Sequence, residues 1–263
     1  MVDISRIHPD ITALSTFHPI PAVGVLTINS FVLHGEQEMI VDTGTTTDSA
    51  EMCETIGSVV DGGKLRWLWI THTDADHIGS VHTLLDTYPN LTVVTTYTGW
   101  VKMSTHAPVP PNRVRLVNPG DSLDLGDRVL HAYVPPLFDA PETTGFIDPV
   151  SNAMFSSDCF GAILPESVHT LDDLSPAELL NAQTKWTAID TPWVTKIDRS
   201  LLNDELEAIR ELDLAMILSA HLPATPNVVE QQLAGVCAAP DAEPFTGIDH
   251  ATLQSWIGRP PPD

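Results

Sequence analysis

Four side chains that can bind metals lie within one short segment, residues 71–79, with the sequence Thr-His-Thr-Asp-Ala-Asp-His-Ile-Gly. His72 and His77 supply imidazoles, and Asp74 and Asp76 supply carboxylates. Neutral imidazole and ionised carboxylate are both good ligands for first-row transition metals. The spacing of these residue types therefore predicts a metal site.

The elements on either side of this segment would place it at the edge of a sheet. The apolar run 65–70 is typical of a buried strand, and apolar residues at helical spacing follow from Ile78. In open α/β sheets, ligands bind where strands end and helices begin. His72 and Asp74 lie two apart in an extended segment, so their side chains point to the same side. The alternative is a polar helix cap made by Asp76, with both histidines in solvent.

Two further candidate ligands follow apolar strands later in the chain. Asp158 comes after the predicted strand 153–156, and His221 comes after the predicted strand 214–218. Either residue alone has an ordinary explanation, an Asp in a turn or a His in a loop. Together with the first segment, they predict that polar groups from several strand ends meet at one edge of a sheet.

The first segment resembles the metal-binding motif of the metallo-β-lactamase superfamily, H-x-H-x-D-H-x-G, with Asp74 in place of the second His. A carboxylate at that position resembles the flavodiiron branch, which has Glu there. Residues 155–161 resemble that branch's segment around its metal-bridging Asp, and residues 217–221 resemble its last ligand strand. The similarity extends from about Asn29 to Pro223. The chain thus resembles an oxygen-binding di-iron domain without its flavodoxin domain.

One ligand of the family is missing, because no His lies between His131 and Asp158. The family's spacing leads to Asp139 as the substitute, and His131 is the other candidate. The resemblance then implies one metal bound by His72, Asp74 and Asp139. A second metal would be bound by Asp76, His77 and His221, and Asp158 would bridge the two. Among these residues, Asp76 and Asp158 are assigned to catalysis.

This ligand set holds four carboxylates, three imidazoles and no thiolate, which favours iron, with manganese or zinc as alternatives. The resemblance implies binding or reduction of dioxygen or nitric oxide, with electrons from a separate electron-transfer protein. The chain has no G-x-G-x-x-G fingerprint for a flavin or dinucleotide. The alternative is a hydrolase that uses a metal-bridging hydroxide on an ester, amide or phosphodiester. A metal held only for stability is a further, non-catalytic interpretation.

An Asp-Thr-Gly sequence at residues 42–44 suggests a remote alternative, an aspartic protease. That chemistry needs two carboxylates that share a proton. No second Asp-Thr-Gly or Asp-Ser-Gly occurs, so a dimer would be required. Metallo-β-lactamase folds carry a similar sequence after an early strand, which would give Asp42 a supporting role instead.

Composition narrows the class of protein. The 263 residues include 35 acidic and 12 basic ones, for a formal charge of −23, so we expect no nucleic-acid partner. The N-terminal residues lack a signal-peptide core and no apolar run is long enough to span a bilayer, so we expect a cytoplasmic protein without membrane contact. Cys53, Cys159 and Cys237 are odd in number, and we expect three small buried thiols without disulfides.

We expect a single domain over residues 1–263, with its core at about 20–257 and a Pro-rich tail at 258–263. Two β-rich layers flanked by helices predict an α/β protein with the metallo-β-lactamase-like αβ/βα four-layer sandwich. A homodimer would be unsurprising for this family. Strands are predicted at 25–33, 38–41, 65–70, 91–95, 114–117, 129–134, 145–148, 153–156 and 214–218, and helices at 49–56, 78–85, 97–105, 175–189, 201–212, 228–236 and 250–257.

Overall fold

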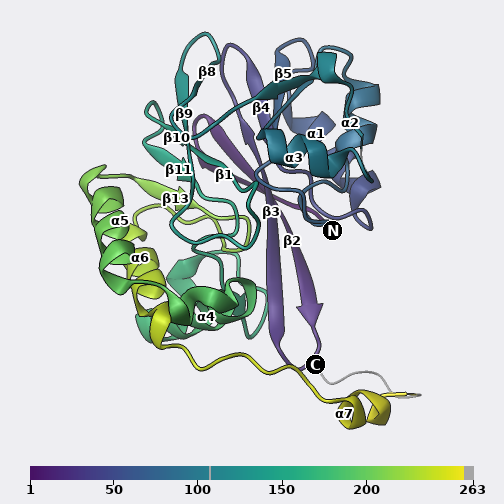
Figure 1. The fold of residues 1–263 in the computed structure, drawn as a ribbon. Helices are drawn as coiled ribbons and strands as arrows, with labels where there is room; N and C mark the ends of the chain where they lie inside the picture. The colour runs from purple at the N-terminus through teal and green to yellow at the C-terminus, as the bar shows by residue number, and fades with distance from the viewer. Residues whose placement is uncertain (107, 258–263) are drawn as a thin grey trace.

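The computed structural model describes residues 1–106 and 108–257, which fold into two sheets with helices on their outer faces (Figure 1). The first sheet has the strand order β1-β2-β3-β4-β5-β6-β7, with β12 paired to β3. Its strands are β1 (Asp3–His8), β2 (Ile11–Ile20), β3 (Gly24–Leu33), β4 (Glu38–Val41), β5 (Leu65–Trp69), β6 (Thr92–Thr95), β7 (Val114–Leu116) and β12 (Ile163–Leu164).

The second sheet has the order β13-β11-β10-β9-β8. Its strands are β8 (Ser122–Asp124), β9 (Val129–Tyr133), β10 (Gly145–Asp148), β11 (Ala153–Phe155) and β13 (Met216–Leu218). The α-helices are α1 (Ser49–Val59), α2 (Val81–Thr87), α3 (Tyr97–Met103), α4 (Pro176–Asp190), α5 (Arg199–Glu211), α6 (Val229–Ala238) and α7 (His250–Ser255). Short 3-10 turns occupy Pro111–Arg113, Leu171–Asp173, Pro192–Lys196 and Ala239–Asp241.

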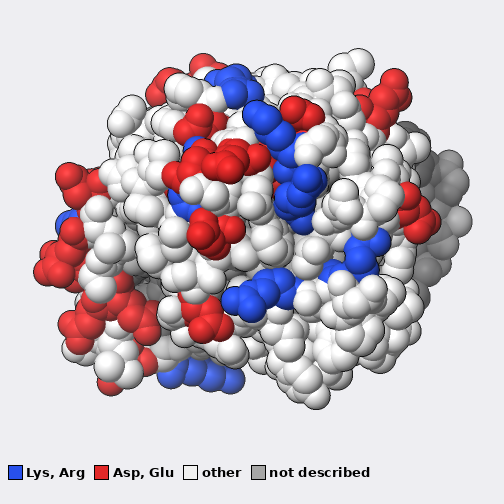
Figure 2. Space-filling view, turned by 90° about the horizontal axis from the view of Figure 1, so that it is seen from above, with Lys and Arg blue, Asp and Glu red and all other residues white. Residues whose placement is uncertain are grey.

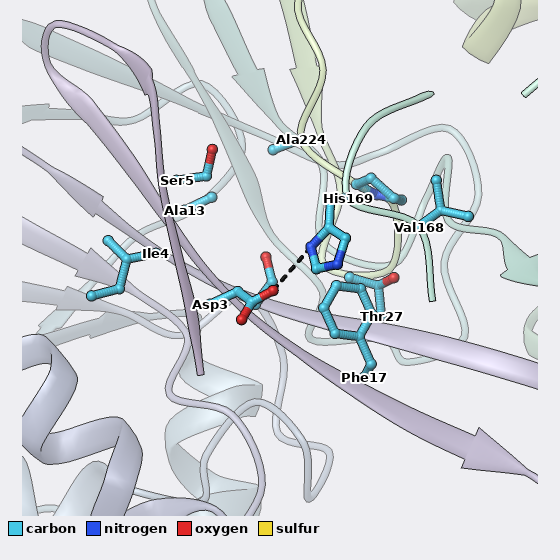
Figure 3. Close-up of a pocket in the computed structure, with 11 residues that line it drawn as sticks. Asp3, Ile4, Ser5, Ala13, Phe17, Thr27, Val168, His169 and Ala224 are labelled. Atoms are coloured by element: carbon cyan, nitrogen blue, oxygen red, sulfur yellow. Dashed lines mark ion pairs between the residues drawn. The ribbon is translucent and has the colours of Figure 1, made fainter. Parts of the chain in front are cut away.

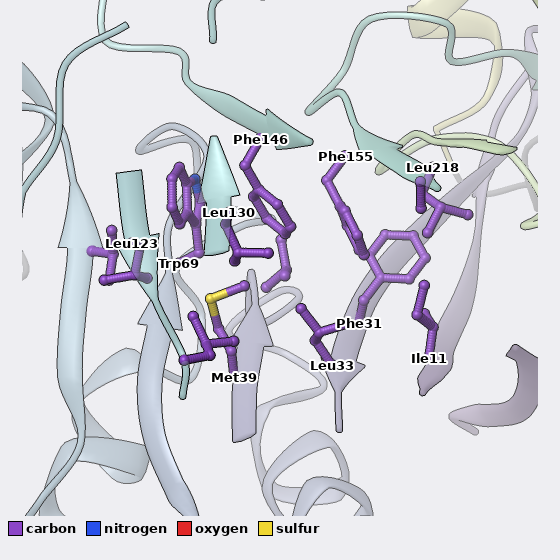
Figure 4. Packing of buried hydrophobic residues seen from close by; sticks show 14 of the residues in the cluster. Ile11, Phe31, Leu33, Met39, Trp69, Leu123, Leu130, Phe146, Phe155 and Leu218 are labelled. Atoms are coloured by element: carbon purple, nitrogen blue, oxygen red, sulfur yellow. The ribbon is translucent and has the colours of Figure 1, made fainter. Parts of the chain in front are cut away.

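The main core lies between the two sheets (Figure 4). Phe31 and Met39 of the first sheet meet Phe146 and Phe155 of the second, and the rings of Phe31 and Phe155 lie edge to face with centroids 5.4 Å apart. Because side chains alternate along a strand, Val32 points to the opposite face, where it packs with helices α1 and α2. One strand thus contributes to two layers of the core.

Helices cover the outer face of each sheet. Buried apolar side chains of α1, α2 and α3 pack on the first sheet, and those of α5 and α6 pack on β11 and β13 of the second. Helix α4 starts with a capping box, in which the side chains of Ser175 and Glu178 each accept a hydrogen bond from the other's backbone N–H. The order helix, sheet, sheet, helix confirms the four-layer sandwich.

The structure corrects several sequence predictions. The core does not begin at about residue 20, because β1 and β2 extend the first sheet at its edge, and Ile11 and Leu14 are fully buried. Strand β8 was not expected, and α2 begins at Val81 rather than near Ile78. The three cysteines are free as predicted, but Cys53 is only partly buried and Cys237 is exposed. The Pro-rich tail at 258–263 lies outside the described residues.

Among the described residues, no helix has the length and apolar character required to cross a bilayer.

Candidate metal centre

Two pairs of parallel strands direct the candidate ligands towards one place. Val41 of β4 lies beside Trp69 of β5, so the segments with Asp42 and His72 leave the first sheet at the same edge. Phe155 of β11 lies beside Leu218 of β13 in the second sheet. The segments with Asp158 and His221 therefore also leave together, as the positions of these residues after their strands predicted.

The structure brings all seven predicted residues into overlapping clusters, in which candidate ligand atoms lie within 4.8 Å of one another. Each cluster has three members: His72, His77, Asp158; Asp76, His77, His221; His72, Asp74, Asp139; and Asp139, Asp158, Asp190. The second and third clusters contain the same residues as the two half-sites that the resemblance implies. His131, the other candidate for the missing ligand, is an exposed residue that bonds to Ser122 and lies outside these clusters.

Asp158 lies between the three imidazoles. Its Oδ1 is 3.1 Å from Nε2 of His77 and 3.3 Å from Nε2 of His221, and its Oδ2 is 3.6 Å from Nε2 of His72. Asp76 spans the second half-site, with Oδ1 at 3.7 Å from His77 Nε2 and Oδ2 at 3.5 Å from His221 Nε2. The carboxylate of Asp158 thus lies close to imidazoles of both candidate half-sites.

The far nitrogen of each imidazole is held by the protein. Nδ1 of His77 lies 2.9 Å from Oδ2 of Asp42, Nδ1 of His221 lies 2.9 Å from the carbonyl oxygen of Thr27, and Nδ1 of His72 lies 3.1 Å from Oγ of Ser157. When Nδ1–H donates to a carboxylate or carbonyl, Nε2 carries the lone pair. These contacts orient Nε2 of His77 and His221 towards Asp158 as potential metal ligands.

Three buried atoms at the centre lack hydrogen-bond partners within residues 1–106 and 108–257: Nε2 of His72, Nε2 of His77 and Oδ1 of Asp158. The last two are close, but they are not oriented as a hydrogen bond. Each unsatisfied buried polar group costs about 1–3 kcal/mol. A cation at this place would coordinate all three atoms, so the residues fit the metals that the resemblance implies.

The carboxylates and imidazoles of the centre shift one another's pKa values. Burial alone would raise the pKa of Asp158, but His221, His72 and His77 hold that pKa well below its usual range. Burial alone would lower the pKa of His221, but Asp158 and Asp76 raise it to about 9. The carboxylates thus favour positive charge on His77 and His221, and a divalent cation would replace those protons.

Asp190 is a member of the cluster that the sequence analysis missed. It is the last residue of α4, and its carboxylate lies with those of Asp139 and Asp158. Burial, together with the charges of Asp158 and Asp139, raises the pKa of Asp190 to about 7. An acidic residue in the last turn of a helix interacts unfavourably with the helix dipole. This unusual position is the feature of the sequence that could have identified Asp190 as a candidate.

Asp42 supports the centre through Nδ1 of His77. It is 2 % exposed, and besides His77 it accepts hydrogen bonds from the backbone N–H and the hydroxyl of Thr71, at 2.8 and 2.7 Å. Both of its oxygens are therefore occupied by groups of this chain. This environment gives Asp42 the supporting role of the metallo-β-lactamase fold and argues against an aspartic protease.

Close packing holds the loops that carry the ligands. A Cβ atom on Gly79 would lie 2.1 Å from the backbone carbon of Thr45, so only glycine lets the start of the helix approach this loop. Trp186 packs its ring on His221, with centroids 4.7 Å apart, and its Nε1 donates to the carbonyl oxygen of Asp158 at 3.0 Å.

Two cavities lie near these elements. One of about 520 Å³ is lined by Thr73, Asp74, His82 and His106, and gives access to the side of the centre where Asp74 is exposed. The other, of about 300 Å³, lies between the first strands and residues 168–169, where His169 pairs with Asp3 (Figure 3). Thr27 lines this second cavity and also holds His221 through its carbonyl oxygen.

The negative charge of the chain is not uniform over its surface. On the face seen in Figure 2, Lys and Arg side chains gather close to groups of carboxylates. The formal charge of −23 is therefore locally offset on this face.

The two packed sheets with outer helices, and the His and Asp cluster at their strand ends, define a metallo-β-lactamase-like domain. The model of the family described as "ODP family beta lactamase" matches residues 26–221, and the chain belongs to this family.

Solved structures with this fold include flavodiiron proteins. The chain superposes on rubredoxin oxygen:oxidoreductase of Desulfovibrio gigas with a TM-score of 0.76 at 20% identity, covering 91% of this chain and 61% of the other. It superposes on a fragment of a putative diflavin flavoprotein of Nostoc with a TM-score of 0.75 at 18% identity, covering 92% of this chain and 96% of the fragment. At these identities the likeness shows the fold alone.

A nitric oxide reductase of Moorella thermoacetica is a curated relative, 23% identical over 191 residues, with coverage of 72% of this chain and 47% of the relative. The chain spans about half or less of the length of the first curated relatives that it matches, 48% of one and 26% of the next.

Proposed function

We propose that the chain holds a dinuclear metal centre. His72, Asp74 and Asp139 bind one ion, Asp76, His77 and His221 bind the other, and Asp158 bridges them. The observation that carries this proposal is the position of Asp158, whose two oxygens face Nε2 atoms from both half-sites. The unsatisfied Nε2 atoms of His72 and His77 support it.

Iron fits this ligand set best, because the set holds four carboxylates and three imidazoles without a thiolate. Two irons held by these residues would supply redox chemistry towards a diatomic ligand. We infer that the centre binds or reduces dioxygen or nitric oxide. The fold neighbour from Desulfovibrio gigas is an oxygen oxidoreductase and the Moorella thermoacetica relative is a nitric oxide reductase, and both support this class of reaction.

The protein's own residues orient the candidate ligands and shield the centre from water. Asp42 and the carbonyl of Thr27 hold the imidazoles of His77 and His221, which are each 1 % exposed on their side chains. These buried imidazoles exclude water from one side of the centre. Asp74 and Asp139 face solvent on the other side, where a small ligand could enter. A separate redox protein would supply the electrons.

The test uses protein loaded with ferrous iron and reduced chemically under an inert atmosphere. We expect consumption of oxygen or nitric oxide, followed with a gas electrode, by the wild type and by a control, Asp86→Asn, in which an exposed carboxylate on α2 is neutralised. Asp158→Asn should lose this activity. Wild-type protein that binds zinc and hydrolyses an ester or phosphodiester, without consuming either gas, would favour the hydrolase instead.

A further inference from the structure

Glu142 is a fully buried carboxylate next to the centre, although it is not in any of the candidate metal clusters. Its Oε1 accepts a hydrogen bond from the hydroxyl of Thr73 at 2.8 Å and pairs with Nζ of Lys102. Lys102 lies on α3 and its side chain is 43% exposed. A buried carboxylate is costly unless it is paired and hydrogen-bonded. Oε1 of Glu142 meets both conditions, whereas Oε2 has no hydrogen-bond partner among the residues that the structure describes.

The Glu142 contact joins the loop that carries His72 and Asp74 to the loop that carries Asp139. Thr73 lies between His72 and Asp74, and Glu142 lies three residues after Asp139. A second bond between the same loops runs from the backbone N–H of Thr144 to the carbonyl oxygen of Thr71, at 2.8 Å. Their relative position is thus set by this backbone bond and by the side-chain bond of Thr73 to Glu142. A longer bond of 3.4 Å, from Nε1 of Trp69 at the end of β5 to the carbonyl oxygen of Thr144, adds to them.

The two half-sites differ in how their ligands are held. In the half-site of Asp76, the imidazoles of His77 and His221 are fixed directly by hydrogen bonds of their Nδ1 atoms. In the other half-site, the carboxylates of Asp74 and Asp139 are exposed and make no side-chain hydrogen bond or ion pair to any of the described residues. Their placement depends on the loops beneath them.

We propose that Glu142, anchored by Lys102, is a positioning residue for one of the two metals. Through Thr73 it holds the loop of His72 and Asp74 against the loop of Asp139, so that these three ligands face one ion. The imidazoles of the other half-site are held instead by Asp42 and by the carbonyl oxygen of Thr27. This inference rests on the proposed dinuclear centre and adds that the two ions depend on different supports.

The test removes the hydroxyl of Thr73 and leaves the Glu142–Lys102 pair in place. Thr73→Val is nearly isosteric, whereas removal of Glu142 itself would strand Lys102 and endanger folding. Thr73→Ser restores the hydroxyl. Thr143→Val is the matched control, since Thr143 is also buried in this region and its hydroxyl has no partner among the residues that the structure describes.

Metal-free proteins are titrated with Co²⁺ without oxygen, and the visible absorption of bound Co²⁺ reports each binding step. We expect two ions in the wild type, in Thr73→Ser and in Thr143→Val. In Thr73→Val, one ion should bind about 10–100-fold more weakly and the other with unchanged affinity, because loss of a supporting hydrogen bond typically has this effect. The unfolding midpoint of each metal-free variant reports general damage to the fold.

Three results would overturn the inference. If Thr73→Val binds both ions as the wild type does, Glu142 positions neither ligand loop. If it weakens both ions equally, the effect belongs to the fold rather than to one half-site. If the wild type itself binds fewer than two ions, the dinuclear centre is wrong and the inference is overturned with it.

Discussion

His77 and Asp42 form a buried pair in which Nδ1 of the imidazole lies 2.9 Å from Oδ2 of the carboxylate. The side chains are only 1 % and 3 % exposed. The pair connects the end of β4 to the loop after β5, and it leaves Nε2 of His77 facing Asp158. Asp42, in the Asp-Thr-Gly segment after β4, thereby supports the candidate ligand His77 in the loop after β5.

Substitution of Asp42 by Asn should weaken metal binding without removing a ligand. The amide keeps the size of the side chain, but it loses the charge that favours the Nδ1–H form of His77. We expect metal affinity to fall about 10–100-fold and the free energy of unfolding to fall by about 1–3 kcal/mol. Competition with a chromogenic chelator measures the affinity. An affinity equal to that of Asp86→Asn would show that Asp42 does not tune the site.

Metal uptake should release protons at neutral pH. In the metal-free centre the pKa of His221 is raised to about 9, so its imidazole is protonated at pH 7. A metal needs the free Nε2 lone pair, and the proton must leave when the ion binds. Calorimetric titrations in two buffers with different ionisation enthalpies count the released protons. Apparent affinity should rise between pH 6 and about pH 9, and identical heats in both buffers would contradict this prediction.

The metal-free protein should lose stability in alkaline solution. The pKa of His221 is about 9 in the folded chain and about 6.5 in an unfolded one. A raised pKa stabilises the fold fully below the unfolded value, and this contribution is lost as pH rises through about 9. Urea unfolding in the presence of a chelator should therefore show a lower free energy of unfolding at pH 9.5 than at pH 6.5. Replacement of His221 by Gln should reduce this difference.

Gly79→Ala should destabilise the loop that carries the ligands. The new Cβ would lie 2.1 Å from the backbone carbon of Thr45 and 2.4 Å from the nitrogen of Thr46, and backbone atoms cannot rotate away. We expect a loss of about 1–3 kcal/mol, as for other overpacked sites.

Gly57→Ala is the matched control for this change. Gly57 lies inside α1, and its new Cβ would meet only the hydroxyl of Tyr88 at an ordinary distance of 3.6 Å. Alanine in a helix is favoured over glycine by about 0.5–1 kcal/mol. Thermal unfolding of both variants makes the comparison, and equal midpoints would show that the approach of Gly79 to residues 44–46 carries no energetic weight.

The candidate ligands could be predicted from sequence where chemistry and strand ends coincide. His72, Asp158 and His221 each follow an apolar strand, and Asp139 was reached through the spacing of a resembled family. The groups that hold the candidate ligands in place could not be predicted in this way. Thr27 holds His221 through a backbone carbonyl 194 residues away in sequence, and any residue type could supply that atom.

The N-terminal strands illustrate the same limit for the fold. Strand β2 pairs with β3 over ten residues, but polar residues interrupt its apolar pattern, and Thr12 and Thr16 are nevertheless buried. Their burial depends on neighbours in the folded sheet, which no local pattern records. Glu142 likewise looks like an ordinary surface residue in the sequence, because Lys102 and Thr73 approach it only in the fold.

Metal content tests most directly whether this chain binds two metal ions. Protein purified without oxygen and without added metal is analysed by elemental mass spectrometry, with Asp158→Asn beside it. The dinuclear centre predicts about two ions per chain, mainly iron, and a clear loss in the variant. Folded wild-type protein without bound metal, or with equal metal in both proteins, would contradict it.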